Sequence, residues 1–272
     1  MARTRSKSFW FKYQIAWRQK KSLLCVGLDS ELSQLPQCVR SDRNPIYTFN
    51  KAIIDATAAY TAAYKPNLAF YLAAGVKGLE ALKLTIDAIP EDIPVILDCK
   101  VGDIGSTMDA YLTAFFEEMG CDAITINPLM GKDVVKMLLT EEKNFAFALA
   151  LTSNPSAKEF MLKNDLYADI ATWIKSFKTK QLGAVVGATQ TEHLSKMRQL
   201  LPEQIFLIPG IGAQGGDLKS VLEHTVNTED EPNILINSSR GIIFKDKTSR
   251  FAEVAATEAA KLRDEIKAGI LQ

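Results

Sequence analysis

The sequence predicts an α/β protein of a single domain, a (β/α)8 barrel of the TIM type with an extra N-terminal helix. Short apolar runs alternate with amphipathic segments along the chain, and eight such runs can be counted. Near-continuous apolar strands that are each followed by a helix indicate a parallel sheet, and eight such units close a barrel. The length of 272 residues also suits such a barrel. An open, doubly wound sheet is the alternative, because strand boundaries are the least exact part of the prediction.

The predicted strands are runs of four to seven mostly apolar residues. They are Leu23–Gly27, Ala62–Lys65, Pro94–Lys100, Ala123–Ile126, Phe145–Leu151, Gly183–Val186, Ile205–Ile208 and Ile234–Asn237. Amphipathic segments between and after them predict the helices. These are Ile46–Tyr60, Val76–Ala88, Thr107–Met119, Lys132–Leu139, Asp165–Phe177, Glu192–Leu200, Leu218–His224 and Arg250–Lys267.

Residues 1–21 hold seven Lys or Arg and no acidic residue, interleaved with aromatic side chains. A transit peptide or a basic surface is one interpretation of this composition. The aromatic positions also suit a helix that packs across the bottom of a barrel, which is the plainer interpretation. With no linker or low-complexity segment, we expect one domain over residues 1–272.

The overall composition is that of a globular protein, with 47% hydrophobic and 24% charged residues. The 32 basic and 32 acidic residues balance, so charge gives no sign of a nucleic-acid or membrane-surface partner. No apolar run approaches the roughly 20 residues that span a bilayer. Cys25, Cys38, Cys99 and Cys121 lie far apart without CxxC spacing or a secretory signal, which predicts reduced thiols and a cytoplasmic location.

Three charged residues follow one another closely at the end of the third predicted strand. Because side chains alternate across a strand, Asp98 and Lys100 share one face and Cys99 takes the other, as a packing residue. Asp103 lies beyond Gly102 and is presented from a loop. A structural salt bridge at a strand edge is the alternative explanation.

Two further charged residues lie at the ends of the first two predicted strands: Asp29 follows the first strand, and Lys65 ends the second. In this barrel, active sites form at the carboxyl ends of the strands. Lys65, Asp98, Lys100 and Asp103 can therefore form an array of alternating charges. Burying such an array costs desolvation, so its presence suggests a use other than stability.

A second feature lies after the last two strands. The segment from Pro209 to Asp217 carries four glycines, among them Gly212, as well as Gln214. These loops are the usual phosphate site of the barrel, and Arg240 after the eighth strand can grip a phosphate with two parallel hydrogen bonds. A merely flexible turn is the alternative, and the GxxxxGK[ST] pattern of a nucleotide-triphosphate loop is missing. With Arg240 the segment predicts a phosphomonoester site.

Other reactive residue types receive plainer interpretations. His193 and His224 fall in predicted helices away from any ligand-like cluster, so surface roles are expected and no metal site. Ser153 follows no GxSxG elbow, which argues against serine hydrolase chemistry. Met130 and Gly131 predict a turn after the fourth strand.

The chain resembles the orotidine 5′-phosphate decarboxylase family, and it is most similar to the longer bacterial branch. The resemblance rests on blocks at nearly every strand end: LLCVGLD (23–29), KPNLAFY (65–71), DCKVGDI (98–104), NPLMG (127–131), TSNP (152–155), PGIGAQGG (209–216) and SRG (239–241). The Asp-x-Lys-x-x-Asp pattern alone is less specific, because related sugar-phosphate lyases share it. One departure is Val101, where the branch usually has a basic residue, and we expect altered packing or surface charge there without loss of activity.

The resemblance implies a cofactor-free and metal-free decarboxylase that converts orotidine 5′-phosphate to UMP in de novo pyrimidine synthesis. It implies a catalytic tetrad of Lys65, Asp98, Lys100 and Asp103, with Lys100 as the proton donor. For substrate binding it implies Asp29 for the ribose hydroxyls, Ser153 for the pyrimidine edge, Gln214 for the phosphate and the base, and Arg240 for the phosphate. Gly212, in the same glycine-rich segment as Gln214, is also implied to bind the substrate. The family's homodimer shares Asp103 and Thr107 across its interface.

Two rival functions stay open on the sequence alone. One is a metal-dependent sugar-phosphate lyase of the same superfamily, and the other is a phosphoribosyl-binding barrel that performs no chemistry. A chelator would inhibit the first. The intact tetrad argues against the second, because a binding protein has no evident need for all four charges.

Overall fold

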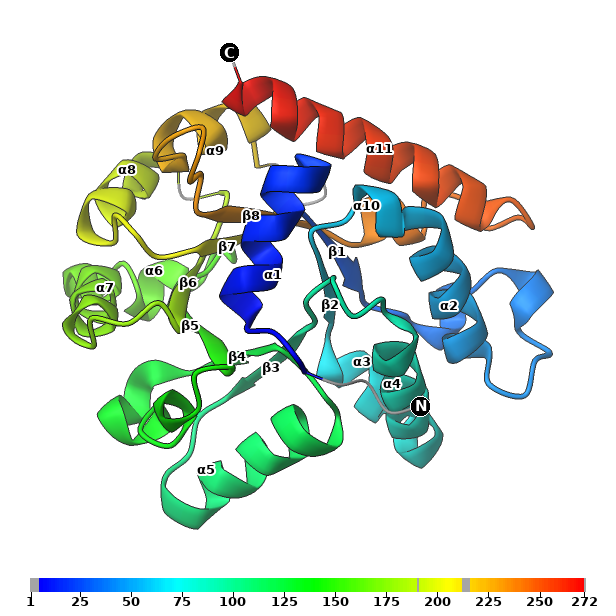
Figure 1. The fold of residues 1–272 in the computed structure, drawn as a ribbon, viewed down its shortest axis with the longest axis horizontal. Helices are drawn as coiled ribbons and strands as arrows, with labels where there is room; N and C mark the ends of the chain where they lie inside the picture. The colour runs from blue at the N-terminus through cyan, green and yellow to red at the C-terminus, as the bar shows by residue number, and fades with distance from the viewer. Residues whose placement is uncertain (1–4, 190, 212–215, 272) are drawn as a thin grey trace.

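The strands form one eight-stranded parallel barrel in the computed structural model, which describes residues 5–189, 191–211 and 216–271 (Figure 1). The strands are β1 Leu24–Leu28, β2 Ala63–Pro66, β3 Ile96–Val101, β4 Ala123–Ile126, β5 Phe145–Leu151, β6 Leu182–Val186, β7 Phe206–Pro209 and β8 Ile234–Ser238. Each agrees with its predicted range within two residues at either end.

The order of hydrogen-bonded strands is β2-β1-β8-β7-β6-β5-β4-β3. Isolated parallel bridges from Tyr64 to Val95 and from Asn67 to Asp98 join β2 to β3, so the sheet closes almost completely. The predicted (β/α)8 barrel is therefore confirmed, and the open-sheet alternative is wrong.

Helices surround the barrel and follow the strands as expected (Figure 1). The longer ones are α2 Pro45–Thr57, α4 Gly75–Ala88, α5 Gly105–Leu112, α7 Leu166–Ser176, α8 Thr191–Leu200, α9 Leu218–Thr225 and α11 Phe251–Ile270. Local sequence fixes several starts: the Asn44 side chain accepts from the Tyr47 amide at α2, and Asp217 accepts from the Ser220 amide at α9. A π-helical turn, Thr113–Glu118, continues α5. No helix in the described ranges is long and apolar enough to cross a membrane.

One predicted helix is wrong. Residues Lys132–Leu139 form no α-helix but contribute to two 3-10 segments, Pro128–Val134 and Leu138–Thr140. Gly131, with φ of 75° and ψ of −147°, breaks the helical path just before the predicted start. Three short helices at strand ends were not predicted: α3 Leu68–Ala73, α6 Ala157–Phe160 and α10 Arg240–Ile243. With four to six residues each, they are too short to show a helical period.

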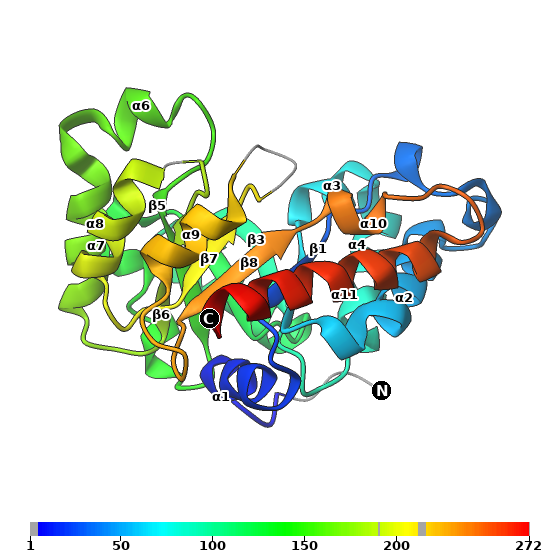
Figure 2. The same ribbon diagram turned by 90° about the horizontal axis from the view of Figure 1, so that it is seen from above.

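The N-terminal helix α1 (Phe9–Ile15) lies across the amino-terminal end of the barrel, and a π-helical turn, Ala16–Lys20, extends it (Figures 1 and 2). Phe9 is fully buried, with its ring 4.4 Å from that of Phe145. The Tyr13 hydroxyl accepts a hydrogen bond from the Ile234 amide at the start of β8. The predicted packing of this helix under the barrel is confirmed, whereas residues 1–4 of the predicted segment lie outside the described residues.

Candidate active site

Three of the predicted charged residues meet at the carboxyl ends of β2 and β3. Lys65 Nζ lies 3.0 Å from Asp98 Oδ2, and Lys100 Nζ lies 2.5 Å from Asp98 Oδ1. The side chains of Lys65 and Asp98 are 5% and 12% exposed, whereas that of Lys100 is 49% exposed. Asp98 therefore bridges two ammonium groups, one buried and one facing solvent at the mouth of the barrel.

The charges of this array stabilise one another. Burial alone would raise the pKa of Asp98, but the ammonium groups of Lys65 and Lys100 outweigh burial and hold that pKa well below its usual range. Burial alone would lower the pKa of Lys65, but Asp98 and then Asp29 outweigh it and raise the pKa. Both groups are therefore charged at neutral pH.

The strand that carries Asp98 and Lys100 is not regular. The β3–β4 register shifts between Leu97 and Val101, and Lys100 has a positive φ of 49°. The expected contact between Asp98 and Lys100 is confirmed, but the strict alternation from which it was predicted does not hold here. The Cys99 thiol donates to the Thr125 carbonyl at 3.4 Å, and burial raises its pKa to about 12. Cys99 is thus held as an un-ionised thiol against β4.

Asp29 follows β1 and faces the same array. Its Oδ1 lies 4.0 Å from Lys65 Nζ. This oxygen is buried and has no hydrogen-bond partner among the described residues. A buried acceptor of this kind is available for a hydroxyl group of a ligand.

The structure does not bring Asp103 to the other three charges. Its carboxylate accepts a hydrogen bond from the Ile104 amide, and neither Lys65 nor Lys100 pairs with it in the described chain. Thr107, in the first turn of α5, is exposed. Within this one chain the tetrad predicted from the sequence is therefore a triad.

Of the residues predicted to bind the substrate, Arg240 and Ser153 lie at the same end of the barrel as the charged array. Arg240 begins α10 directly after β8, is exposed, and forms no ion pair with any described residue. Ser153 follows β5, and its carbonyl accepts from the Thr189 hydroxyl at 2.8 Å. Gly212 and Gln214 lie outside the described residues, so their predicted roles stay predictions.

Two glycines allow the close approaches that this end of the barrel requires. A Cβ on Gly187 would lie 2.6 Å from the Ser153 amide nitrogen, and one on Gly27 would lie 2.7 Å from the Ser239 Cβ. The segments after β5 and β6 are thus packed backbone against backbone at the mouth, and the backbone of β1 lies close against the Ser239 side chain after β8.

Comparison with known proteins matches this chain to one family. The model of the orotidine 5′-phosphate decarboxylase / HUMPS family covers residues 22–254. The chain belongs to this family. It is 45% identical over 256 residues to the orotidine 5′-phosphate decarboxylase of Flavobacterium johnsoniae, with 91% of this chain and 93% of that protein covered. The protein of the same name from Bacteroides fragilis is 42% identical, with 92% and 93% covered.

Solved structures place the chain beside members of the same family. The OMP decarboxylase of Leishmania donovani superposes with a TM-score of 0.81 at 33% identity, covering 96% of this chain and all of that one. The UMP synthase of the same organism gives a TM-score of 0.82 at 35% identity, covering 96% of this chain and 57% of that chain.

Prediction from the sequence missed one residue of this candidate site. Thr125 lies on β4, and its hydroxyl donates to Asp98 Oδ1 at 3.0 Å. The available signal was a single polar residue within the apolar run Ala123–Ile126. Threonine is common in strands, so this signal alone indicates no function.

The two histidines each contact a residue of their own helix. His193 contacts Glu192 at 3.2 Å, and His224 Nδ1 lies 2.6 Å from the Ser220 carbonyl oxygen. Within the described ranges, no group of three or more His, Cys, Asp or Glu side chains is placed to hold a metal ion.

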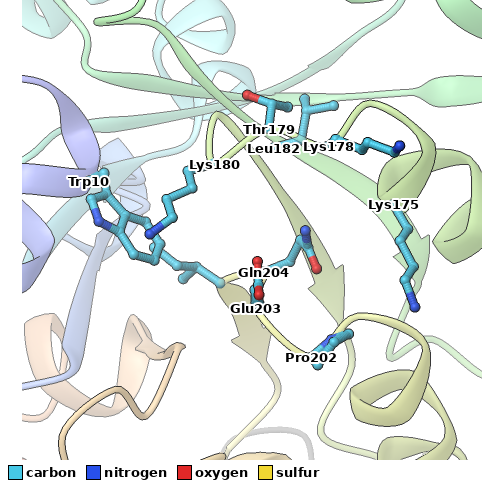
Figure 3. Close-up of a pocket in the computed structure, with 10 residues that line it drawn as sticks. Trp10, Lys175, Lys178, Thr179, Lys180, Leu182, Pro202, Glu203 and Gln204 are labelled. Atoms are coloured by element: carbon cyan, nitrogen blue, oxygen red, sulfur yellow. The ribbon is translucent and has the colours of Figure 1, made fainter.

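A separate cavity of about 320 Å³ lies at the opposite end of the barrel (Figure 3). It is lined by Trp10 of α1 and by residues that lead into β6 and β7, including Lys180 and Gln204. The Lys180 ammonium lies over the Trp10 ring, 5.0 Å from its centroid. None of the predicted site residues lines this cavity, so it is not the candidate active site.

Proposed function

We propose that this protein is an orotidine 5′-phosphate decarboxylase, a carboxy-lyase that forms UMP and carbon dioxide in pyrimidine biosynthesis. The observation that carries the proposal is the Lys65–Asp98–Lys100 array at the mouth of the barrel, in a chain 45% identical to a protein of that name. The reaction needs neither a metal ion nor an organic cofactor.

The chemistry requires a positive charge at a fixed place. Loss of carbon dioxide leaves an electron pair in the plane of the pyrimidine ring, where the π system cannot delocalise it. The Lys100 ammonium stabilises this pair and then transfers one proton from Nζ to the ring carbon that lost the carboxylate. Asp98 holds this ammonium in place, with Nζ 2.5 Å from its Oδ1.

Substrate binding uses polar groups around the mouth of the barrel. Asp29 Oδ1 accepts from a ribose hydroxyl, and the Arg240 guanidinium binds the phosphate. Ser153 lies at the pyrimidine edge, and Gly212 and Gln214 contribute the phosphate loop. Binding energy from the phosphate, remote from the reacting carbon, contributes to stabilising the transition state.

The proposed active form is a homodimer in which Asp103 and Thr107 enter the neighbouring subunit's site. Support comes from their position, because Asp103 does not reach Lys65 or Lys100 of its own chain. Large apolar side chains face solvent next to Asp103 in the chain and in the segment after the neighbouring strand β4, with Ile104 52%, Leu129 70% and Met130 55% exposed. An exposed apolar group of this kind is typical of a surface that a partner covers.

The proposed location is the cytoplasm. Cys25, Cys38 and Cys99 form no disulfide bond. Unpaired cysteines suit a reducing compartment.

The test follows the ultraviolet absorbance of orotidine 5′-phosphate mixed with the purified protein, with and without chelator. We expect the orotate absorbance to disappear with UMP as product, with no effect of chelator. Lys100→Ala should lose roughly 10³-fold or more of the turnover and still bind UMP, because it removes the charge and the proton donor. Lys143→Ala, which removes an exposed lysine elsewhere, is the matched control.

Three outcomes would contradict the proposal. Inhibition by chelator would indicate the metal-dependent sugar-phosphate lyase. Binding of UMP without turnover by the unaltered protein would indicate a silent phosphoribosyl-binding barrel. Full turnover in Lys100→Ala would show that Lys100 takes no part in the reaction.

A further inference from the structure

We propose that Thr125 is a positioning residue that sets where the Lys100 ammonium lies relative to the substrate. The inference rests on the proposed decarboxylase function and deepens it, since the Thr125 side chain acts through Asp98 and Lys100. Its evidence is the hydrogen bonding of one buried hydroxyl.

The first observation is a bulge in β3. Leu97 pairs with Ile124 and Val101 pairs with Ile126, so three residues of β3 lie opposite the single residue Thr125. Two extra residues on one strand lift backbone N–H groups out of the ladder. Buried N–H groups that lose a ladder partner need another acceptor.

The Thr125 hydroxyl is that acceptor. The Cys99 amide donates to Oγ1 at 3.0 Å, and the Lys100 amide donates to the same atom at 2.9 Å. A hydroxyl has one proton and two acceptor sites, so accepting both amides leaves its proton for one remaining partner. That partner is Asp98 Oδ1, 3.0 Å away.

The Thr125 hydroxyl therefore links the backbone of β3 to the Asp98 carboxylate. Asp98 Oδ1, to which it donates, is also the oxygen that lies 2.5 Å from Lys100 Nζ. The Thr125 hydroxyl oxygen also accepts a hydrogen bond from the Lys100 amide. Lys100 has a φ of 49°, which lies in the left-handed region. A non-glycine residue adopts this conformation only when its surroundings impose it.

The requirement is for the hydroxyl and not for the shape of the side chain. Thr125 is only 1% exposed and lies in a strand whose other residues, Ala123, Ile124 and Ile126, are apolar and fully buried. Valine would fill the same volume and suits a strand equally well. Replacing Thr125 by valine would therefore remove the hydroxyl and leave the volume of the side chain unchanged.

The experiment compares Thr125→Val with Thr125→Ser. In Thr125→Val we expect kcat for decarboxylation to fall by about 10- to 100-fold, because loss of these hydrogen bonds shifts Lys100 from its reacting position. The affinity for UMP should stay within about threefold, since the phosphate and ribose contacts are untouched. Thr125→Ser keeps the hydroxyl and should retain kcat within about threefold.

The matched control is Thr225→Val. Thr225 is also fully buried, and its hydroxyl donates to the Val221 carbonyl in α9, far along the chain from the array. This variant should lower the unfolding temperature with kcat unchanged, which separates a loss of stability from a loss of positioning. If Thr125→Val does not fold, Thr125→Cys replaces it, and its weakly hydrogen-bonding thiol should give a kcat below that of Thr125→Ser.

The outcomes keep the two proposals apart. An inactive unaltered protein would overturn the decarboxylase function itself. Normal kcat in folded Thr125→Val, or in Thr125→Cys, would overturn the role of Thr125 and leave the function intact. Equal losses of kcat and of UMP affinity would also overturn it, because they would indicate general distortion of the site.

Discussion

At the residue scale, Asp98 organises the candidate site. It pairs with one buried and one half-exposed lysine and accepts a third hydrogen bond from Thr125. Lys65 in turn lies between the carboxylates of Asp98 and Asp29. Each charge thus faces at least one opposite charge, which offsets the cost of removing it from water.

The lowered pKa of Asp98 makes a prediction about stability and pH. A carboxyl whose folded pKa lies below its unfolded value of about 4 stabilises the fold above that pH. This contribution is lost as pH falls further toward the folded pKa. Asp98→Asn should lower the free energy of unfolding by about 3 kcal/mol at pH 7, because the buried Lys65 ammonium then loses the nearer of its two carboxylates.

Urea unfolding from pH 7 to pH 3 would measure this effect. Below pH 4, the difference between the unaltered protein and Asp98→Asn should narrow by about 1.4 kcal/mol per pH unit. Asp55→Asn is the control, because its ion pair with Lys51 is exposed and should contribute little. A constant difference down to pH 3 would contradict the assigned pKa direction.

At the element scale, an ion pair between two buried side chains attaches α1 to the barrel. The amphipathic pattern of α1 does not reveal this ion pair. Lys12 Nζ lies 2.8 Å from Asp122 Oδ1, and each side chain is 1% exposed. Asp122 Oδ2 also accepts from the Val95 amide just before β3. The helix thereby contacts the strand that carries Asp98 and Lys100, at its opposite end.

Breaking this ion pair should destabilise the whole protein. Lys12→Met should lower the free energy of unfolding by about 3 kcal/mol, because it leaves Asp122 buried without its lysine. Lys20→Met removes an exposed ion pair with Asp92 and should cost less than about 1 kcal/mol. Denaturant unfolding of both variants would measure the contrast, and equal effects would show that burial does not matter at Lys12.

At the scale of the whole molecule, the charged array lies at the carboxyl ends of the strands. Helix α1 covers the opposite end of the barrel (Figure 2). A buried arginine supports that other end. The Arg198 guanidinium donates to the carbonyls of Leu201, Gln204, Thr225 and Asn233, and burial lowers its pKa to about 10. The mouth, by contrast, keeps Arg240 and half of Lys100 open to solvent.

The proposed sharing of Asp103 predicts complementation between subunits. Lys100→Ala and Asp103→Ala should each be nearly inactive alone. If each site takes Lys100 from one subunit and Asp103 from the other, mixed dimers regain one intact site. After unfolding and refolding an equal mixture, about a quarter of the sites should therefore be active.

Turnover per site would measure this recovery. A mixture of Lys100→Ala with Asp98→Ala serves as the control, because both residues belong to the same subunit's site and give no intact one. Failure of the first mixture to exceed this control would show that Asp103 does not cross an interface.

The sequence by itself determined the barrel, its eight strands and most of the charged residues at the strand ends. Short apolar runs and the alternation of strand with helix are local properties, and a parallel barrel gathers the loops after its strands at one end. The tertiary structure alone decided how those residues meet. The β3 bulge, the hydroxyl of Thr125 and the buried pairing of Lys12 with Asp122 join residues 25 or more positions apart. No local pattern specifies such contacts, because they depend on how neighbouring strands and α1 pack in three dimensions.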